Sequence, residues 1–164
     1  MKNFSRPLVP FFPMMIDLND KEVLIVGGGK VASRRAETLL RCGAKITAVS
    51  LNFDEDFPKV FKKISRAFII DDIKEKFSLI IAATNDRNIN KLIRDTAKSK
   101  KIPVNVCDSQ SECDFFFPSL VNVENVAASV CTAGLDSKLT RKLSDKLREV
   151  WASWIEKEIK EKSF

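Results

Sequence analysis

The sequence of 164 residues contains no histidine. This absence excludes serine or cysteine nucleophiles activated by histidine, histidine-ligated zinc sites and acid–base catalysis by imidazole. Any proton chemistry must therefore depend on carboxylates, lysines or cysteines. A search for catalytic groups can be limited to these side chains.

The sequence also lacks a long apolar run and a paired cysteine motif. Pro7, Pro10 and Pro13 interrupt the first apolar residues, so we expect no signal peptide and no run of the roughly 18 apolar residues that span a membrane. The four cysteines form no CxxC pair, which favours reduced thiols and a cytoplasmic location. Cys107 and Cys113 flank a short polar stretch, and we interpret them as buried thiols. No metal site is predicted.

The excess of positive charge is modest. Lys and Arg number 28 against 22 Asp and Glu, which gives a net charge of +6. This balance favours acidic ligands but is too small to indicate a nucleic-acid partner. The hydrophobic fraction of 45% and the charged fraction of 30% are ordinary for a folded domain and exclude a disordered chain.

The pattern after residue 20 predicts a strand, a glycine turn and a helix. An apolar run over 22–26 stops at three glycines, and 30–42 follows with helical spacing. We expect an inner helix face composed of Val31, Ala32, Leu39 and Leu40. Gly43 should end the helix, and 45–49 is typical of the next strand.

Further alternation of strands and helices predicts a parallel sheet. The strand-like runs are 60–70, 78–83 and 103–107, and helical spacing covers 86–100. Apolar strands that alternate with helices favour an α/β fold with helices on both faces of the sheet. We therefore predict a Rossmann-type domain over residues 1–113.

The region 114–164 has a different pattern of predicted elements. Two strand-like runs, 115–121 and 126–131, predict a β-hairpin outside the parallel sheet. One amphipathic helix is predicted over 137–162 and would span about 39 Å. A second subunit is the simplest partner for such a long apolar stripe, so we predict a dimerisation region and a homodimer. The alternative is a helix that lies wholly across its own domain.

The glycine turn fits the dinucleotide-binding pattern G-x-G-x-x-G/A, with alanine in the third place. It follows a strand and opens a helix, as the pattern requires. The predicted cofactor-binding residues are Gly27, Gly28, Gly29, Lys30, Val31 and Ala32. Exposed amides at the start of the helix would meet the pyrophosphate of the cofactor. The alternative is a glycine-rich turn without a ligand.

The acidic residue that usually binds the adenosine ribose about 20 residues further on is missing. Ser50 and Asn52 stand there instead, so Ser50 is a candidate ribose contact and the choice between NAD and NADP stays open. Thr84 and Asn85 follow a buried strand and are expected to line the dinucleotide. The alternative is ordinary helix capping by Asn85 or Asp86.

Five motifs in one order carry a resemblance to a known family. They are PMMIDL from Pro13, VLIVGGGKVASRR, AATND, Asn105-Val-Cys-Asp108 and Phe117-Pro-Ser119. Over residues 12–146 the chain resembles precorrin-2 dehydrogenase, the NAD-dependent dehydrogenase domain of siroheme synthases. The resemblance implies oxidation of the tetrapyrrole precorrin-2 to sirohydrochlorin with NAD, on the way to siroheme or cobalamin. It also implies that iron insertion, a ferrochelatase activity, can accompany this step.

The resemblance also implies roles for individual residues. Asp108 matches the aspartate that the family uses in catalysis, and it is the predicted general base, with Asn105 of the same motif beside the substrate. Thr132 and Arg141 match a loop and a helix start that would meet substrate carboxylates. Ala133, Asp136 and Ser137 depart from that family loop. The alternative for this stretch is a surface loop and a helix cap.

Two other functions share the same fold. A dinucleotide sensor would use the long helix to signal occupancy to a partner, and a stand-alone sirohydrochlorin metallochelatase would need no nucleotide. The glycine turn argues against the chelatase. Longer relatives continue into a small helical domain and, in bifunctional members, a methyltransferase. We therefore expect 114–164 to be a shortened version of that region.

Overall fold

The computed structural model describes residues 12–123, 126–132 and 136–161. The chain divides into two compact units. We call Pro13–Phe115 the sheet unit. We call the described part of the second unit, from residue 116 onward, the hairpin–helix unit.

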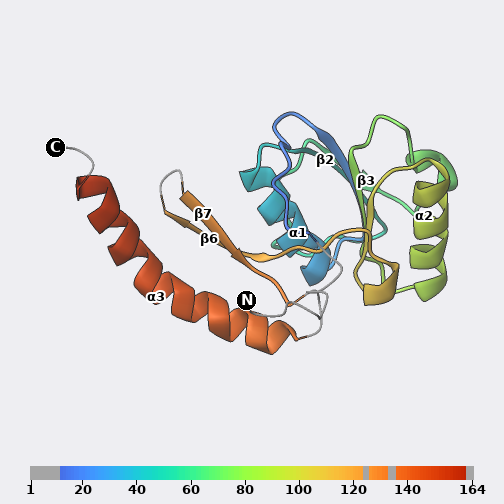
Figure 1. The fold of residues 1–164 in the computed structure, drawn as a ribbon. Helices are drawn as coiled ribbons and strands as arrows, with labels where there is room; N and C mark the ends of the chain where they lie inside the picture. The colour runs from blue at the N-terminus through green and yellow to red at the C-terminus, as the bar shows by residue number, and fades with distance from the viewer. Residues whose placement is uncertain (1–11, 124–125, 133–135, 162–164) are drawn as a thin grey trace. The chain divides into compact units, whose positions relative to one another are not determined.

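The sheet unit is built on five parallel strands (Figure 1). They are β1 (Glu22–Val26), β2 (Lys45–Ser50), β3 (Lys62–Ser65), β4 (Leu79–Ala82) and β5 (Val104–Val106). Their order is β3-β2-β1-β4-β5, and every neighbouring pair is parallel. The predicted Rossmann-type α/β fold is confirmed. Successive strands are added toward one edge of the sheet from β1 to β3 and toward the other edge from β4 to β5. Such folds bind ligands at this switch point, here between β1 and β4, beyond the carboxyl ends of the strands.

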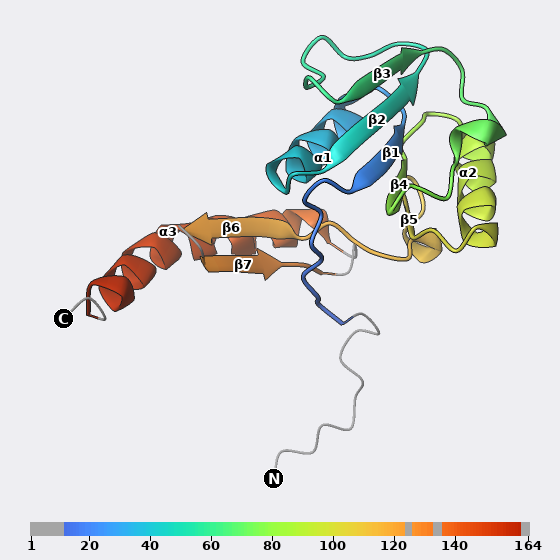
Figure 2. The same ribbon diagram turned by 90° about the horizontal axis from the view of Figure 1, so that it is seen from above.

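Two helices cover the sheet. The helices α1 (Lys30–Arg41) and α2 (Arg87–Ser99) lie on opposite sides of the strands (Figure 2). Right-handed crossovers explain this placement, because β1-α1-β2 and β4-α2-β5 progress in opposite directions across the sheet. Short 3₁₀ turns, η1 (Ile70–Asp72) and η2 (Gln110–Glu112), complete the connections.

The predicted inner face of α1 is partly wrong. Ala32 and Leu39 are buried as expected, but Val31 is 43% exposed and Leu40 is only half-buried. The buried apolar positions are Ala32, Ala36 and Leu39, which share one side of the helix at spacings of four and three, and Ser33 is buried beside them. Val31 lies one residue before this side and therefore points toward solvent.

The strand predicted over 60–70 is shorter than expected. Only Lys62–Ser65 pairs, as an edge strand, and Ile69 and Ile70 are about half exposed. The chain then turns into η1, because the Asp72 carboxylate accepts a hydrogen bond from the Ile69 amide at 3.0 Å and binds Arg66. These contacts favour a turn over further pairing.

One cluster of core side chains in the sheet unit lies between the sheet and α2. β4 is buried along its whole length, which agrees with a strand covered on both faces. The buried side chains of this cluster are Leu24, Val26, Val49, Ile73, Phe77, Ile80, Ala82, Ile93, Ala97, Ile102, Val104 and Val106. This rigid platform fixes the carboxyl ends of β1, β4 and β5, where the candidate site lies.

The hairpin–helix unit consists of β6 (Ser119–Val123), β7 (Val126–Val130) and α3 (Ser137–Glu161). The two strands pair antiparallel, as predicted, although the first strand begins at residue 119 rather than at 115. On α3, Ser144 is buried and Leu147, Trp151 and Ile155 are half-buried. No helix in the described part of the chain is long and apolar enough to cross a membrane.

Candidate functional site

The glycine turn joins β1 to α1 and is held by its neighbours. Gly27 has a φ of +124°, and a Cβ there would lie 2.1 Å from the carbonyl oxygen of Ala83. A Cβ on Gly28 would lie 2.2 Å from the carbonyl oxygen of Asn52. Both positions therefore require glycine for the turn itself.

Gly29 differs from the other two glycines. A Cβ at this position would meet no atom within 4 Å, so the space beside its backbone is open. Gly29 is also the N-cap of α1, and no side chain caps the first amides of the helix. Unpaired amides beside open space form a cradle for an anion such as pyrophosphate. Lys30, at the first position of the helix, adds a positive charge there.

The loop after β2 carries the predicted ribose contact. The Ser50 hydroxyl donates to the carbonyl oxygen of Asn52 at 2.7 Å, and the Asp54 amide donates to the carbonyl oxygen of Gly28 at 2.8 Å. The loop therefore folds against the glycine turn. Asp54 is an acidic residue near the turn that the sequence prediction missed, because it lies further along the chain than the usual spacing.

The loop after β4 is fixed from inside. Asn90 is fully buried on α2, and its Oδ1 accepts from the Thr84 amide at 3.1 Å while its Nδ2 donates to the Thr84 carbonyl at 3.0 Å. The Thr84 hydroxyl contacts Asn90 as well, at 2.7 Å. Sequence analysis missed Asn90, although a polar residue on the inner face of a helix was its signal.

The residue that caps the start of α2 is Asp86 rather than Asn85. Asp86 accepts hydrogen bonds from the amides of Asn88 at 2.8 Å and Ile89 at 3.3 Å, so Asp86 is the N-cap. Asn85 is exposed next to it. Thr84 and Asn85 keep their place at the edge of the sheet beside the glycine turn, because the Ala83 amide bonds the carbonyl oxygen of Val26 at 2.8 Å.

Asp108 lies in the turn that follows β5. The preceding amide, of Cys107, donates to the carbonyl oxygen of Ala82 at 2.9 Å, which ties this turn to the end of β4. Asp108 Oδ1 lies 3.2 Å from Arg87 Nη1, and its side chain is 34% exposed. The glycine turn, Thr84 and Asp108 therefore share the carboxyl edge of β1, β4 and β5.

Asn105 is buried below this edge. It is 4% exposed, and its Nδ2 donates to the Phe115 carbonyl at 2.8 Å. The thiol of Cys113 lies 3.4 Å from the same nitrogen. These contacts fix the chain after β5, so the geometry favours a supporting role for Asn105 over direct contact with a substrate.

The two cysteines beside Asp108 have the character of unreactive thiols. Burial raises the pKa of the Cys107 thiol above its ordinary value and outweighs the attraction of Arg35. Burial also raises the pKa of Cys113. Within the described residues, no group of three or more His, Cys, Asp or Glu side chains is placed to hold a metal ion.

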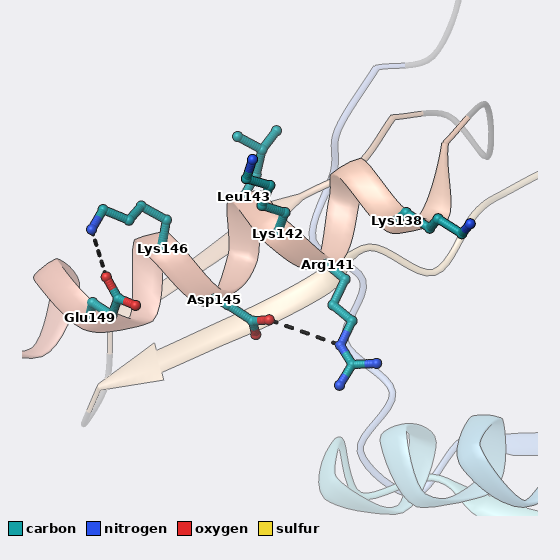
Figure 3. Close-up of a pocket in the computed structure, with 7 residues that line it drawn as sticks. All are labelled: Lys138, Arg141, Lys142, Leu143, Asp145, Lys146 and Glu149. Carbon is teal, nitrogen blue, oxygen red and sulfur yellow. Dashed lines mark hydrogen bonds and ion pairs between the residues drawn. The ribbon is translucent and has the colours of Figure 1, made fainter.

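Thr132 and Arg141 lie in the hairpin–helix unit. The Thr132 hydroxyl bonds the Asp136 carbonyl at 2.9 Å and the Thr140 hydroxyl at 2.8 Å, so it shapes the start of α3. Arg141 is 85% exposed, with its Nε 3.9 Å from Asp145 Oδ2. Figure 3 shows it among outward-pointing charged side chains of α3. They are Lys138, Lys142, Asp145, Lys146 and Glu149.

The fold and the glycine cradle define a dinucleotide-binding domain of the Rossmann type. A family model described as "Putative NAD(P)-binding" matches residues 14–119. This range is well over half of the chain, and the chain belongs to this NAD(P)-binding family.

Two similar proteins are siroheme synthases. A siroheme synthase of Actinobacillus succinogenes is 34% identical over 142 residues, which are 84% of this chain and 30% of that protein. A siroheme synthase of Baumannia cicadellinicola is 32% identical over 150 residues, 88% of this chain and 32% of that protein. The chain therefore spans about a third of the length of these relatives. The sequence resemblance to siroheme synthases is confirmed.

A solved structure supports the fold. The structure of SirC, a precorrin-2 dehydrogenase, matches with a TM-score of 0.70 and 23% identity. The match covers 89% of this chain and 76% of that chain. It extends the agreement in fold beyond the region of the family model.

Proposed function

We propose that this chain is an NAD⁺-dependent dehydrogenase that oxidises precorrin-2 to sirohydrochlorin on a route to siroheme or cobalamin. One observation carries the proposal. An open anion cradle at Gly29 and the carboxylate of Asp108 lie at the same edge of one sheet. The names of the relatives, siroheme synthase and precorrin-2 dehydrogenase, support the choice of substrate.

The residues present fit a dinucleotide. The amides at the start of α1 would bind the pyrophosphate, and the loop at Ser50 would contact the adenosine ribose. Thr84 and Asn85 would line the nicotinamide half. Bound NAD⁺ supplies the acceptor for a hydride, which leaves the protein to orient the substrate and to remove a proton.

Asp108 is the proposed proton acceptor. The reaction removes a hydride and a proton from adjacent atoms of the tetrapyrrole and forms a double bond, with NADH and a proton as the other products. Asp108 is a partly exposed carboxylate in the turn after β5, at the same edge of the sheet as the cradle. Because the chain has no histidine, the proton acceptor is a carboxylate, a lysine or a cysteine. The raised pKa values of Cys107 and Cys113 disfavour these two thiols as bases, which favours the carboxylate of Asp108.

The tetrapyrrole carries many carboxylates, and Arg141 is the proposed contact for one of them. Its guanidinium is exposed and close to three lysines on α3 (Figure 3). Arginine binds carboxylates through two parallel hydrogen bonds. The contacts of Asn105 and Thr132 favour a supporting role for each residue in shaping its own loop over the direct substrate contact expected from the sequence.

We also propose that the protein is a cytoplasmic homodimer that pairs through α3. Four large apolar side chains stay 44% to 55% exposed on this helix. They are Leu139, Leu143, Val150 and Trp154. At 3.6 residues per turn they fall within about 60° of one another, so they form one stripe that a second copy would bury. Sedimentation equilibrium tests this proposal, because Leu143→Asp should shift the protein to a monomer while Lys142→Asp should not.

The test of the activity uses purified protein, precorrin-2 and NAD⁺ without oxygen, with NADH formation as the readout. We expect turnover by the wild type, loss of turnover in Asp108→Ala, and unchanged affinity for NAD⁺ in that variant. Asp71→Ala is the matched control, because Asp71 is an exposed carboxylate in η1.

Each other outcome has a definite meaning. Turnover by Asp108→Ala at the wild-type rate would show that the base is assigned wrongly. A wild type that binds NAD⁺ but does not oxidise precorrin-2 would favour a dinucleotide sensor. A wild type that inserts iron into sirohydrochlorin but does not oxidise precorrin-2 would favour the chelatase.

A further inference from the structure

Four charged side chains of alternating sign form a continuous series that begins on α2 and ends at Asp108. Arg94 Nη1 binds Glu112 Oε1, and Arg87 Nη2 lies 2.6 Å from the same oxygen. The other nitrogen of that guanidinium, Arg87 Nη1, lies 3.2 Å from Asp108 Oδ1. The series Arg94, Glu112, Arg87, Asp108 is therefore continuous, and we call it the charge chain.

The inner end of the charge chain is more buried than its outer end. The side chains of Arg94 and Glu112 are 17% and 19% exposed, whereas those of Arg87 and Asp108 are 45% and 34% exposed. The hydrogen bond from Arg87 is the main reason that the pKa of Glu112 lies below its ordinary value. Glu112 is thus held as a carboxylate and anchors Arg87 firmly.

The position of Arg87 in α2 is unusual for a cation. It is the first residue of the helix, and the first turn contains no acidic residue. The partial positive charge of a helix N-terminus disfavours a cation there. Glu112 and Asp108, which come from the segment after β5, offset this cost. A residue that opposes the local preference and is compensated by tertiary partners is typical of a functional position.

We propose that Arg87 is a positioning residue for Asp108. Glu112 fixes one nitrogen of the guanidinium, and the other nitrogen then holds Oδ1 of Asp108 in the turn after β5. The partly exposed carboxyl group keeps a defined direction at the edge of the sheet. This inference rests on the proposed function, because it assigns to Asp108 the task of accepting the proton.

Arginine suits this task better than lysine. Its planar group presents several donors in a fixed fork and can bridge two carboxylates at once. A lysine at this position would act as a point charge and could hold only one carboxylate. It would therefore lose its contact with either Glu112 or Asp108. Arg87→Lys should therefore restore little of what Arg87→Met removes.

A double-mutant cycle separates positioning from a general structural effect. In the wild-type background we expect Arg87→Met to lower kcat for precorrin-2 oxidation about 10- to 100-fold, the usual cost of a misplaced catalytic group. The affinity for NAD⁺ should stay within about twofold. In an Asp108→Asn background the same substitution should lower the residual rate by less than about twofold, because a residue that acts through Asp108 has nothing left to position.

A second readout does not require the reaction. Carbodiimide-driven labelling of carboxyl groups, followed by mass spectrometry, reports how each aspartate is held. In Arg87→Met we expect Asp108 to be labelled several times faster than in the wild type. The matched control is Arg66→Met, which breaks another Arg–Asp pair, with Asp72, at the opposite edge of the same sheet. The control should leave the labelling of Asp108 and kcat unchanged.

The outcomes distinguish this inference from the proposed function. Equal rate losses in both backgrounds, or unchanged labelling of Asp108 in Arg87→Met, would overturn the positioning role. A wild type without turnover would overturn the proposed function instead, and the labelling experiment would still decide whether Arg87 holds Asp108.

Discussion

The two units of this chain use their apolar residues differently. In the sheet unit the strands β1, β2, β4 and β5 supply a core in which most side chains are fully buried. In the described part of the hairpin–helix unit, one apolar side chain is buried, that of Val121 at 4% exposure. Large apolar side chains on α3 are about half exposed. One unit buries its apolar surface within itself, and the other leaves apolar surface exposed.

The difference follows from the number of layers. The sheet unit has helices on two faces of a five-stranded sheet, so both faces are covered. The hairpin–helix unit has two strands and one helix, and a two-stranded hairpin is marginal without further packing. This difference agrees with the proposal that the sheet unit carries the chemistry and that the hairpin–helix unit serves in assembly.

The largest effect is expected from the glycine turn of the sheet unit. Gly27→Ala places a Cβ 2.1 Å from the Ala83 carbonyl at a φ of +124°. Backbone strain and the clash together should cost about 3 to 6 kcal/mol of stability. Thermal unfolding monitored by circular dichroism measures the loss. A stable Gly27→Ala protein would show that β1 and β4 can separate at this point.

The neighbouring glycine sharpens this prediction. Gly29→Ala should change the stability by less than about 1 kcal/mol, because a Cβ meets only open space. The same methyl group would stand in the cradle, so we expect the affinity for NAD⁺ to fall at least tenfold. Calorimetric titration with NAD⁺ measures this. Unchanged affinity would exclude Gly29 from the cofactor site.

The second prediction compares one substitution in both units. Leu24→Ala removes a fully buried side chain from the sheet unit and should cost about 2 to 5 kcal/mol. Leu143→Ala, on α3, removes a side chain that is 46% exposed and should cost less than about 1 kcal/mol in the monomer. Urea unfolding at low protein concentration measures both. Equal losses would contradict the distinction between the units.

The elements of the sheet unit could be predicted from the sequence because their signals are local. A short apolar run before three glycines and a helix after them defines β1, the turn and α1. The same holds for β4, β5 and α2. The ends of β3 could not be predicted, because they depend on the contact of Asp72 with Arg66 and with the Ile69 amide rather than on the hydrophobic pattern.

The candidate site shows the same limit. The glycine turn, Thr84 and Asp108 are recognisable as motifs at the ends of strands. Asn90 and Arg87 are not, because their partners come from other loops and the fold alone brings them together. The apolar stripe predicted for α3 has a half-buried side, next to the hairpin, and an exposed side. The sequence pattern does not indicate where one side ends and the other begins.

The third prediction concerns Asn90. Asn90→Ala leaves the Thr84 amide without its buried acceptor, which should cost about 1 to 3 kcal/mol. The loop after β4 should loosen, so we expect hydrogen exchange to quicken at the Thr84 amide. Asn88→Ala is the control, because Asn88 is an exposed residue at the start of the same helix. Slow exchange in Asn90→Ala would show that other contacts fix the loop.

The smallest expected effect compares an Arg–Asp pair in each unit. The hydrogen bond from Arg66 is the main reason that the pKa of Asp72 lies below its ordinary value of 3.8. A carboxyl group with a lowered pKa stabilises the fold above its unfolded pKa, and this contribution disappears as the pH falls through the folded value. Asp72→Asn should therefore cost about 1 kcal/mol at neutral pH, and the difference from the wild type should shrink below about pH 4.

The control pair lies on α3, where Arg148 Nη1 is 2.6 Å from Asp145 Oδ1. Both side chains are about half exposed, whereas the Asp72 side chain is only 8% exposed. Solvent screens the exposed pair, so Asp145→Asn should change stability by less than about 0.5 kcal/mol at neutral pH. Urea unfolding between acidic and neutral pH measures both variants. A larger loss in Asp145→Asn than in Asp72→Asn would mean that α3 depends on its surface charges more than the sheet unit does on its edge.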